Sequence, residues 1–222
     1  MEPDPSRGPA ATASPGERVL RGATEARVYL VRHGQTPSNA AGLLRGHDDL
    51  PLDPLGLAQA AQLGRIFAEV PVELAAIFSS PLQRALGTAR PIAAATGASV
   101  IVEPRLIDRD YGPWTGKSVQ AFLAHLGGRD SAPGVESVAA MRLRAIAALT
   151  EAVARFPGGA IAVVAHDVVN RAILTQLVPD LADAELGQRV GCWNLLCRVQ
   201  GRWTAPIVDA VPEDRRLPHP PG

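Results

Sequence analysis

The sequence is poor in cysteine, lysine and aromatic residues, and it has no excess of either charge. Its 222 residues contain 2 cysteines and 4% aromatic residues, with 22 basic against 22 acidic side chains. Proteins that bind nucleic acid along its backbone usually carry a basic excess or a basic block, and this sequence has neither. No segment approaches the ~20 apolar residues that a membrane-spanning helix needs. We therefore expect neither a nucleic-acid partner nor a membrane partner.

The two cysteines are placed too far apart to form a disulfide bond. Cys192 and Cys197 lie in a segment whose pattern predicts a strand, and five extended residues span roughly 16 Å. We interpret both as small, partly buried apolar residues. The amino terminus has neither a basic start nor an apolar segment, so we expect a cytoplasmic protein rather than a secreted one.

One domain is expected between two tails. Residues 1–25 are rich in proline, glycine, alanine and serine without hydrophobic periodicity, which predicts a disordered tail. Prolines recur in residues 212–222, where we expect a second, flexible tail. Residues 26–211 remain, and they are enough for a single domain with a sizeable core.

Predicted strands and helices alternate along this domain. The strands are expected at residues 27–33, 74–79, 100–102, 160–165, 194–200 and 203–208, the last two joined as a hairpin at Gly201-Arg202. One helix is expected to begin at Asp53-Pro54. Four more helices are expected at residues 81–96, 117–126, 137–155 and 167–177. This alternation predicts an α/β fold, with a mainly parallel central sheet flanked by helices on both faces in a three-layer sandwich.

Basic side chains follow the carboxyl ends of three predicted strands. Arg32 and His33 end the first strand, Arg84 follows the second, and His166 follows the strand at residues 160–165. The carboxyl ends of parallel strands share one edge of a sheet, so these side chains are expected to converge. Arginine binds phosphoryl oxygens in a fork, and histidine can attack phosphorus. The pattern therefore indicates a phosphoryl site.

The motifs around these residues resemble the histidine phosphatase superfamily, in its phosphoglycerate-mutase-like branch. The shared segments are Arg-His-Gly-Gln-Thr at 32–36, Ser-Ser-Pro-Leu-Gln-Arg-Ala at 79–85, Leu-x-Asp-x-Asp-Tyr-Gly-x-Trp-x-Gly at 106–116, and Val-Ala-His at 164–166. They occur in the family's order, and the resemblance covers about residues 27–208. It implies the fold of that family as well as its chemistry.

The resemblance also implies a role for each basic residue. His33 would be the nucleophile that forms a phosphohistidine, and two adjacent guanidiniums would help to keep it neutral. Arg32, Arg84 and His166 would form a cationic pocket for the phosphoryl group, and Asn39 would add a neutral donor. Fixed cations and amide donors then replace a metal, so neither a metal nor another cofactor is expected.

Two carboxylates are candidates for the proton donor of this site. Asp108 falls where most of the family places its acid, usually a glutamate, which protonates the leaving group and later takes a proton from water. Asp110 lies two residues further on, and on an extended segment it would share a face with Asp108. We favour Asp108.

Besides Asp110, three further polar residues are candidates for the substrate side of the site. They are Thr36, Glu136 and Asp167. Glu136 either lines that side or supports the cap of the following helix. Asp167 stands where many relatives have glycine, and we interpret it as the cap of its helix, with a role in orienting His166 or Arg171 as the alternative.

We therefore expect a metal-independent phosphatase that hydrolyses a small phosphorylated metabolite. A phosphoglycerate mutase is one alternative, but such mutases resemble longer cores with segments that shield the site from water. A phospho-ligand-binding protein without turnover is another. The sequence identifies neither the natural substrate nor whether the chain forms a homodimer.

Overall fold

The computed structural model describes residues 24–70, 73–181 and 186–212. Within them six strands form one sheet in the order β3-β2-β4-β1-β5-β6. The strands are β1 (Ala26–Arg32), β2 (Leu74–Ser79), β3 (Val100–Val102), β4 (Ala160–Ala165), β5 (Trp193–Val199) and β6 (Arg202–Ala210). Apart from residues 24, 25 and 212, the predicted tails at 1–25 and 212–222 lie outside the described residues.

Four of the strands pair with one another in parallel, and the other two join the sheet through antiparallel pairings. β1 pairs with β4 in parallel, and β2 joins β4 to β3 in the same sense, whereas β5 and β6 add to β1 as an antiparallel pair. Every residue of β4 is buried, as its continuous apolar run predicts for a strand covered on both faces. The mainly parallel α/β sheet expected from the sequence is confirmed.

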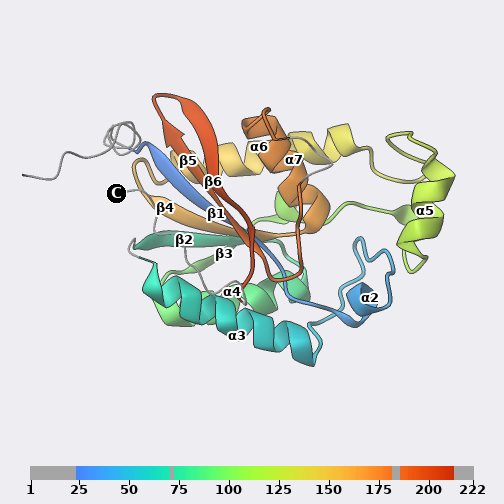
Figure 1. Ribbon diagram of the computed structural model, residues 1–222, viewed down its shortest axis with the longest axis horizontal. Helices are drawn as coiled ribbons and strands as arrows, with labels where there is room; N and C mark the ends of the chain where they lie inside the picture. Colours follow the sequence, from blue (N-terminus) through green and yellow to red (C-terminus); the bar gives the residue numbers. More distant parts are fainter. Residues whose placement is uncertain (1–23, 71–72, 182–185, 213–222) are drawn as a thin grey trace, which may run out of the picture.

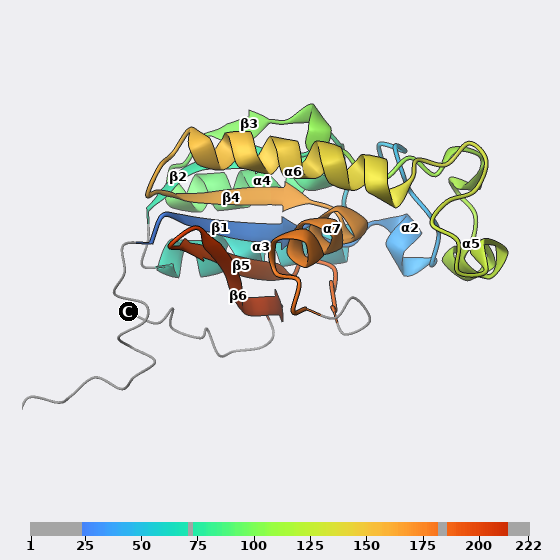
Figure 2. The same cartoon turned by 90° about the horizontal axis from the view of Figure 1, so that it is seen from above.

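Helices cover both faces of this sheet (Figures 1 and 2). The helices are α2 (Pro37–Ala40), α3 (Pro54–Glu69), α4 (Gln83–Thr96), α5 (Val119–Leu126), α6 (Val138–Ala154) and α7 (Asp167–Leu177). Alternate residues of β1 enter different cores, because successive side chains of a strand point to opposite faces. Val28 and Leu30 pack in the core with α6 and α7, and Tyr29 and Val31 pack in the core with α3 and α4.

The remaining helices lie beyond the sheet. Figure 2 shows α2 and α5 past the carboxyl ends of β1 and β4, where the arrows of these parallel strands point. The loops at this edge are therefore the part of the fold that surrounds the strand ends. Among the described residues, none of the helices combines the length and the apolar character that crossing a membrane requires.

Several boundaries differ from the prediction. α4 begins at Gln83 rather than at residue 81, because Leu82 keeps an extended backbone as the residue before the helix. α5 begins at Val119 rather than at residue 117, with the Ser118 side chain accepting a hydrogen bond from Ala121 N. The sequence also gave no sign of α2, a single turn that Thr36 caps.

The hairpin turn lies one residue earlier than predicted. Val199 pairs with Arg202, so the two residues between them form the turn. They are Gln200 and Gly201, with φ angles of 49° and 74°. Two-residue hairpin turns of this kind require a positive φ at both central positions, and the choice of Gly201-Arg202 overlooked that Arg202 belongs to β6.

Two glycines bring the loop after β1 into direct backbone contact with the start of α3. A Cβ atom on Gly56 would lie 2.0 Å from the carbonyl oxygen of Gln35, and one on Gly34 would lie 2.5 Å from the carbonyl oxygen of Gly56. No side chain fits in either gap. Asp53 caps α3 by accepting a hydrogen bond from Gly56 N at 2.8 Å, so the contact is formed at a fixed helix end.

Gly56→Ala is expected to destabilise the protein by about 2 kcal/mol or more, because the new methyl group must displace backbone. Gly87→Ala is the matched control in α4, since its Cβ would meet only the end of the Leu52 side chain, at 3.2 Å. We expect the control to change stability by less than about 1 kcal/mol. Urea unfolding of both variants measures this, and equal effects would contradict the proposed backbone contact.

Candidate active site

His33 lies directly after β1 and is fully buried. Its Nδ1 atom lies 2.6 Å from the carbonyl oxygen of Gly34, which can only accept a hydrogen bond. In the neutral ring the proton therefore resides on Nδ1, and Nε2 carries the lone pair. Within the described part of the chain, Nε2 is buried without a hydrogen-bond partner. This nitrogen is oriented and chemically available as a nucleophile.

The surroundings of His33 hold its ring in the uncharged form. Burial lowers the pKa of His33 well below its ordinary value of 6.5, and the neighbouring His166, Arg84 and Arg32 lower it further. The two imidazole rings lie 5.2 Å apart between their centroids. Burial, together with nearby guanidiniums, also lowers the pKa of His166 well below 6.5. Both rings are neutral near pH 7.

Arg84, Asp108 and His166 meet beside this pair of rings. Arg84 Nη2 lies 3.0 Å from Asp108 Oδ2, and that oxygen lies 3.7 Å from His166 Nδ1. The other ring nitrogen of His166 lies 2.8 Å from Ser80 Oγ. Arg84 also donates to backbone carbonyls of the loop at residues 46–48, at 2.7 and 2.8 Å. The carboxylate of Asp108 therefore lies beside both Arg84 and His166.

Arg32 is held from the opposite side by Asp167. Its Nη1 atom lies 3.1 Å from Asp167 Oδ2 and also donates to the carbonyl oxygen of Gln188. The other carboxylate oxygen of Asp167 lies 2.7 Å from Arg171 Nε. The prediction that Asp167 occupies the cap position of α7 is therefore wrong. His166 occupies the cap position of α7 without a side-chain bond, and Asp167 is the first helical residue.

Buried side-chain amides form a hydrogen-bond network with the loop residue that contacts Arg32. Gln188 Nε2 donates to Asn194 Oδ1 at 2.8 Å, and Asn194 Nδ2 donates to the carbonyl oxygen of Leu30 at 2.9 Å. Asn170 Nδ2 lies 3.3 Å from Gln188 Oε1. These bonds fix the loop whose carbonyl accepts from Arg32. The sequence analysis missed this network, since isolated amides carry no local pattern.

The unexpected helix α2 positions Asn39. The Oδ1 atom of Asn39 accepts hydrogen bonds from Thr36 N at 3.1 Å and from Thr36 Oγ1 at 2.9 Å. This holds the amide oxygen and leaves the amide nitrogen, which has no partner among the described residues, as a donor. Asn39 lines the cavity at the site, whereas Thr36 is fully buried behind it. Thr36 thus contacts Asn39 rather than the substrate side.

The other two acidic candidates lie outside the cavity. Asp110 Oδ1 accepts from Gly112 N at 2.8 Å within a tight turn. Glu136 pairs with Arg144 at 2.8 Å and accepts from Asp110 N at 3.2 Å. The structure therefore brings Asp108, and not Asp110 or Glu136, next to the basic cluster. Their contacts stabilise the loop that carries Asp108.

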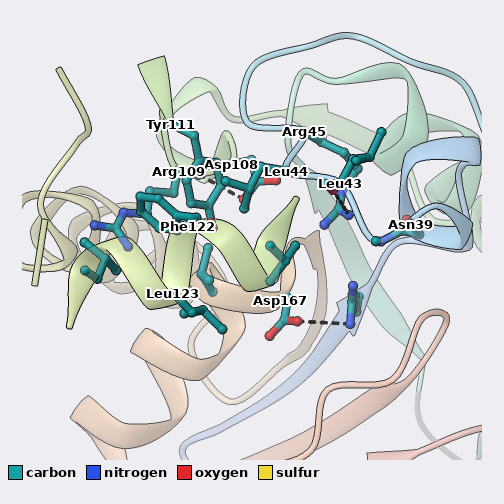
Figure 3. Close-up of a pocket in the computed structure, with 15 residues that line it drawn as sticks. Asn39, Leu43, Leu44, Arg45, Asp108, Arg109, Tyr111, Phe122, Leu123 and Asp167 are labelled. Carbon is teal, nitrogen blue, oxygen red and sulfur yellow. Dashed lines mark hydrogen bonds and ion pairs between the residues drawn. The ribbon is translucent and has the colours of Figure 1, made fainter. Parts of the chain in front are cut away.

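A cavity of about 320 Å³ is lined by Arg32, Asn39, Asp108 and Asp167 of this site, together with Arg109. Figure 3 shows Arg45 and Asn39 on one side of it, Phe122 and Leu123 of α5 on the other, and Asp167 below. Its apolar lining includes Leu43, Leu44, Val119, Phe122, Leu123 and Leu126. Arg45 also lines the cavity, and the sequence analysis did not select it, because a single loop arginine gives no signal.

The described residues offer no obvious metal centre. Within them, no group of three or more His, Cys, Asp or Glu side chains is placed to hold a metal ion. The groups that could bind an oxyanion are instead guanidiniums, imidazoles and the amide of Asn39. Together with a neutral nucleophile, these donors suit the binding and transfer of a phosphoryl group.

Comparison with known proteins points to one family. The sequence model of the histidine phosphatase superfamily (branch 1) matches residues 28–207. A probable phosphoglycerate mutase of Proteus mirabilis is 41% identical over 86 residues, which are 39% of either chain. The adenosylcobalamin/alpha-ribazole phosphatase of Salmonella typhimurium is 35% identical over 88 residues, 40% of this chain and 43% of the relative. The matches thus span less than half the length of these curated relatives.

Solved structures extend the match over most of the chain. A mycobacterial glucosyl-3-phosphoglycerate phosphatase is 28% identical, with a TM-score of 0.72 over 83% of this chain and 98% of its own. A second structure of that phosphatase is a complex with VO3.

The two buried histidines predict a loss of stability on acidification. Both have pKa values well below 6.5 in the fold, whereas in the unfolded chain they titrate near 6.5. As the pH falls below that value, the unfolded state binds more protons than the native state, so the free energy of unfolding decreases. Each histidine contributes up to about 1.4 kcal/mol per pH unit in this window.

Urea unfolding between about pH 7 and pH 5 tests this expectation. His33→Asn should show a shallower pH dependence than the unmodified protein. His125→Asn, at an exposed position on α5, should keep the original slope. A stability that does not change over this range would show that the histidines are already protonated in the fold.

Proposed function

The chain belongs to the histidine phosphatase superfamily (branch 1), and from this premise we propose that it hydrolyses small phosphomonoesters through a phosphohistidine on His33. One observation carries the proposal. The Nε2 atom of His33 is buried, unprotonated and unpartnered within the described residues, beside Arg32, Arg84 and His166. Relatives named as phosphatases support hydrolysis as the overall reaction.

In the first proposed step, the phosphoryl group moves from the substrate to His33. Arg32, Arg84 and the amide of Asn39 bind the nonbridging oxygens, where negative charge develops in the transition state. The lone pair of His33 Nε2 forms the P–N bond as the P–O bond to the alcohol breaks. Protonated Asp108 gives its proton to the departing oxygen, so a neutral alcohol leaves.

In the second step, water releases the phosphate. Asp108, now a carboxylate, takes a proton from a water molecule as its oxygen attacks phosphorus. The P–N bond breaks, its electron pair returns to Nε2, and His33 is again neutral. The basic cluster binds the same oxygens in both steps, and neither step needs a metal ion.

In this scheme the substrate replaces the two carboxylates as the partner of Arg32 and Arg84. Without a ligand, Asp108 pairs with Arg84 and Asp167 pairs with Arg32, at 3.0 and 3.1 Å. A phosphomonoester dianion competes with both carboxylates for these guanidiniums. When it takes over Arg84, Asp108 loses its ion pair and binds the proton that it gives to the departing oxygen in the first step. The carboxylates keep the guanidiniums in position, and they also weaken the attraction for phosphate.

Phosphoglycerate mutase activity is the second candidate, because a probable phosphoglycerate mutase is among the relatives. A mutase returns the phosphoryl group to an organic acceptor, whereas a phosphatase gives it to water. Supplying 3-phosphoglycerate with its bisphosphate primer distinguishes isomerisation from release of inorganic phosphate. A phosphate-dependent thermal shift without turnover of any ester would indicate a binding protein instead.

We expect the purified protein to release inorganic phosphate from p-nitrophenyl phosphate in the presence of EDTA, with inhibition by orthovanadate. His33→Ala should abolish turnover and the acid-labile phosphoenzyme that rapid quenching traps. His125→Ala, at an exposed position on α5, is the control and should retain both. Loss of activity in EDTA, or labelling of His33→Ala, would refute the proposed mechanism.

Asp108→Asn should slow turnover most for substrates with poor leaving groups, by about a hundredfold or more for alkyl phosphates. p-Nitrophenolate needs little protonation, so the loss should be smaller there. The same variant frees Arg84 from its carboxylate, and KM should fall. Asp167→Asn changes the other carboxylate of the cavity, and its effect on turnover should not depend on the leaving group. If Asp167→Asn and not Asp108→Asn slowed poor leaving groups most, Asp167 would be the acid.

A further inference from the structure

The cavity continues past its proposed phosphoryl-binding end into an apolar part. Arg32, Asn39 and Asp108 line the polar end, whereas the loop after α2 and one side of α5 supply mainly aliphatic and aromatic side chains. We call this second part of the lining the apolar wall. It consists of Leu43, Leu44, Val119, Phe122, Leu123 and Leu126. The alcohol part of a phosphomonoester bound at the polar end has this wall as its neighbour.

Leu123 is the residue of the wall that packing within the fold leaves uncovered. Phe122 and Leu126 are buried in a small core with Leu44 and Tyr111, but the Leu123 side chain is 59% exposed. Of the large apolar residues that are exposed in the described part of the chain, Leu123 alone lines this cavity. Figure 3 shows it across the cavity from Leu43. An apolar group bound between them would remove this leucine from water, which favours binding.

Backbone hydrogen bonds fix the wall to the polar end of the cavity. Val119 N, at the start of α5, donates to the carbonyl oxygen of Gly42 at 3.0 Å. Leu44 N donates to the carbonyl oxygen of Lys117 at 2.9 Å. Gly42 follows directly after the turn that positions Asn39, whose amide is a proposed ligand of the phosphoryl group. The spacing between the phosphoryl ligands and the apolar wall is therefore set by the fold.

Arg109 is the charged residue whose guanidinium lies beside the rings of this wall. Its Nε and Nη2 atoms donate to the carbonyl oxygens of Glu136 and Asp130, at 2.8 and 2.6 Å. Its Cζ atom lies 5.6 Å and 6.0 Å from the ring centroids of Tyr111 and Phe122. Backbone acceptors and aromatic faces thus already engage this cation, and it supports the wall. A carboxylate on the substrate would have to compete with these contacts.

The chemistry of the wall selects against polar alcohols. A hydroxyl or carboxylate group placed against aliphatic side chains loses its water without gaining a partner, which weakens binding. An alkyl or aryl group in the same place gains from burial. The cavity volume of about 320 Å³ lies at the lower end of the range for small-molecule sites, so the group that fits is a small one.

We propose that the substrates are phosphomonoesters of small apolar alcohols, with a short alkyl or single-ring aryl group that packs against Leu123 and the rest of the apolar wall. The inference rests on the proposed function and names the substrate class of the same site. Phosphorylated hydroxy acids and phosphorylated polyols are the contrasting classes. A second copy of this chain seated on Leu123 is the contrasting occupant of the wall.

The first test compares ethyl, butyl and hexyl phosphate, whose alcohols are nearly equal in acidity and so differ only in apolar surface. We expect kcat/KM to rise by about twofold to fourfold for each added methylene until the cavity is filled. Glycerol 3-phosphate and 3-phosphoglycerate should be poorer substrates than butyl phosphate. Equal kcat/KM along the alkyl series, or a preference for either polar compound, would overturn the proposal.

The second test changes Leu123. Leu123→Gln should lower kcat/KM for hexyl phosphate by about threefold to tenfold and leave ethyl phosphate nearly unchanged, whereas Leu123→Met should keep the original series. Leu143→Gln is the matched control, because Leu143 on α6 is 75% exposed and does not line the cavity. Both glutamines stand at exposed helix positions, and circular dichroism checks that the variants fold. An equal loss for ethyl and hexyl phosphate, or a dimer that Leu123→Gln dissociates, would overturn the proposal.

Binding of alkylphosphonates, measured by titration calorimetry, separates this inference from the proposed function, because their P–C bond is not hydrolysed. If no ester is turned over, the phosphatase proposal fails, and the apolar wall is still tested. Tighter binding of hexylphosphonate than of ethylphosphonate, with a difference that Leu123→Gln reduces and Leu143→Gln does not, supports the assignment. Equal binding of the two phosphonates, or tighter binding of 3-phosphonopropionate than of butylphosphonate, overturns it.

Discussion

His33 is uncharged in this fold because burial and the neighbouring cations oppose its protonation, and the rest of the site is arranged around that fact. A charged imidazole would have no lone pair on Nε2 and would repel Arg32 and Arg84. The carbonyl oxygen of Gly34 fixes the ring by accepting from Nδ1. Gly34 also lies directly against Gly56, so the start of α3 packs beside the residue that orients the proposed nucleophile.

Holding several guanidiniums around one small volume creates a second constraint, because like charges repel in the absence of a ligand. Asp108 and Asp167 relieve this repulsion by pairing with Arg84 and Arg32. The pairs keep the donors in place before the substrate arrives, which is the preorganisation that electrostatic catalysis requires. They also reduce the free positive charge of the site.

The sequence predicts the parts of the site that follow directly from strand ends. His33, Arg84 and His166 were selected because parallel strands share an edge, and the structure brings them together. Asp108 was favoured over Asp110 only by its place in the family's motif, and in the structure the Asp110 carboxylate accepts from Gly112 N in a tight turn instead. Gln188 lies 156 residues from Arg32 in the chain, and no local pattern reveals that contact.

The cavity joins two parts of the fold that are specified in different ways. Its basic side stands on the ends of β1, β2 and β4, whose register is fixed by two buried faces. Its apolar side comes from α5 and from residues 43–44, which are joined by the bridge between Leu43 and Ser118. Changes in these loops can alter the contacts to an alcohol without moving the phosphoryl site. Relatives named for different phosphorylated compounds are the expected consequence of such a division.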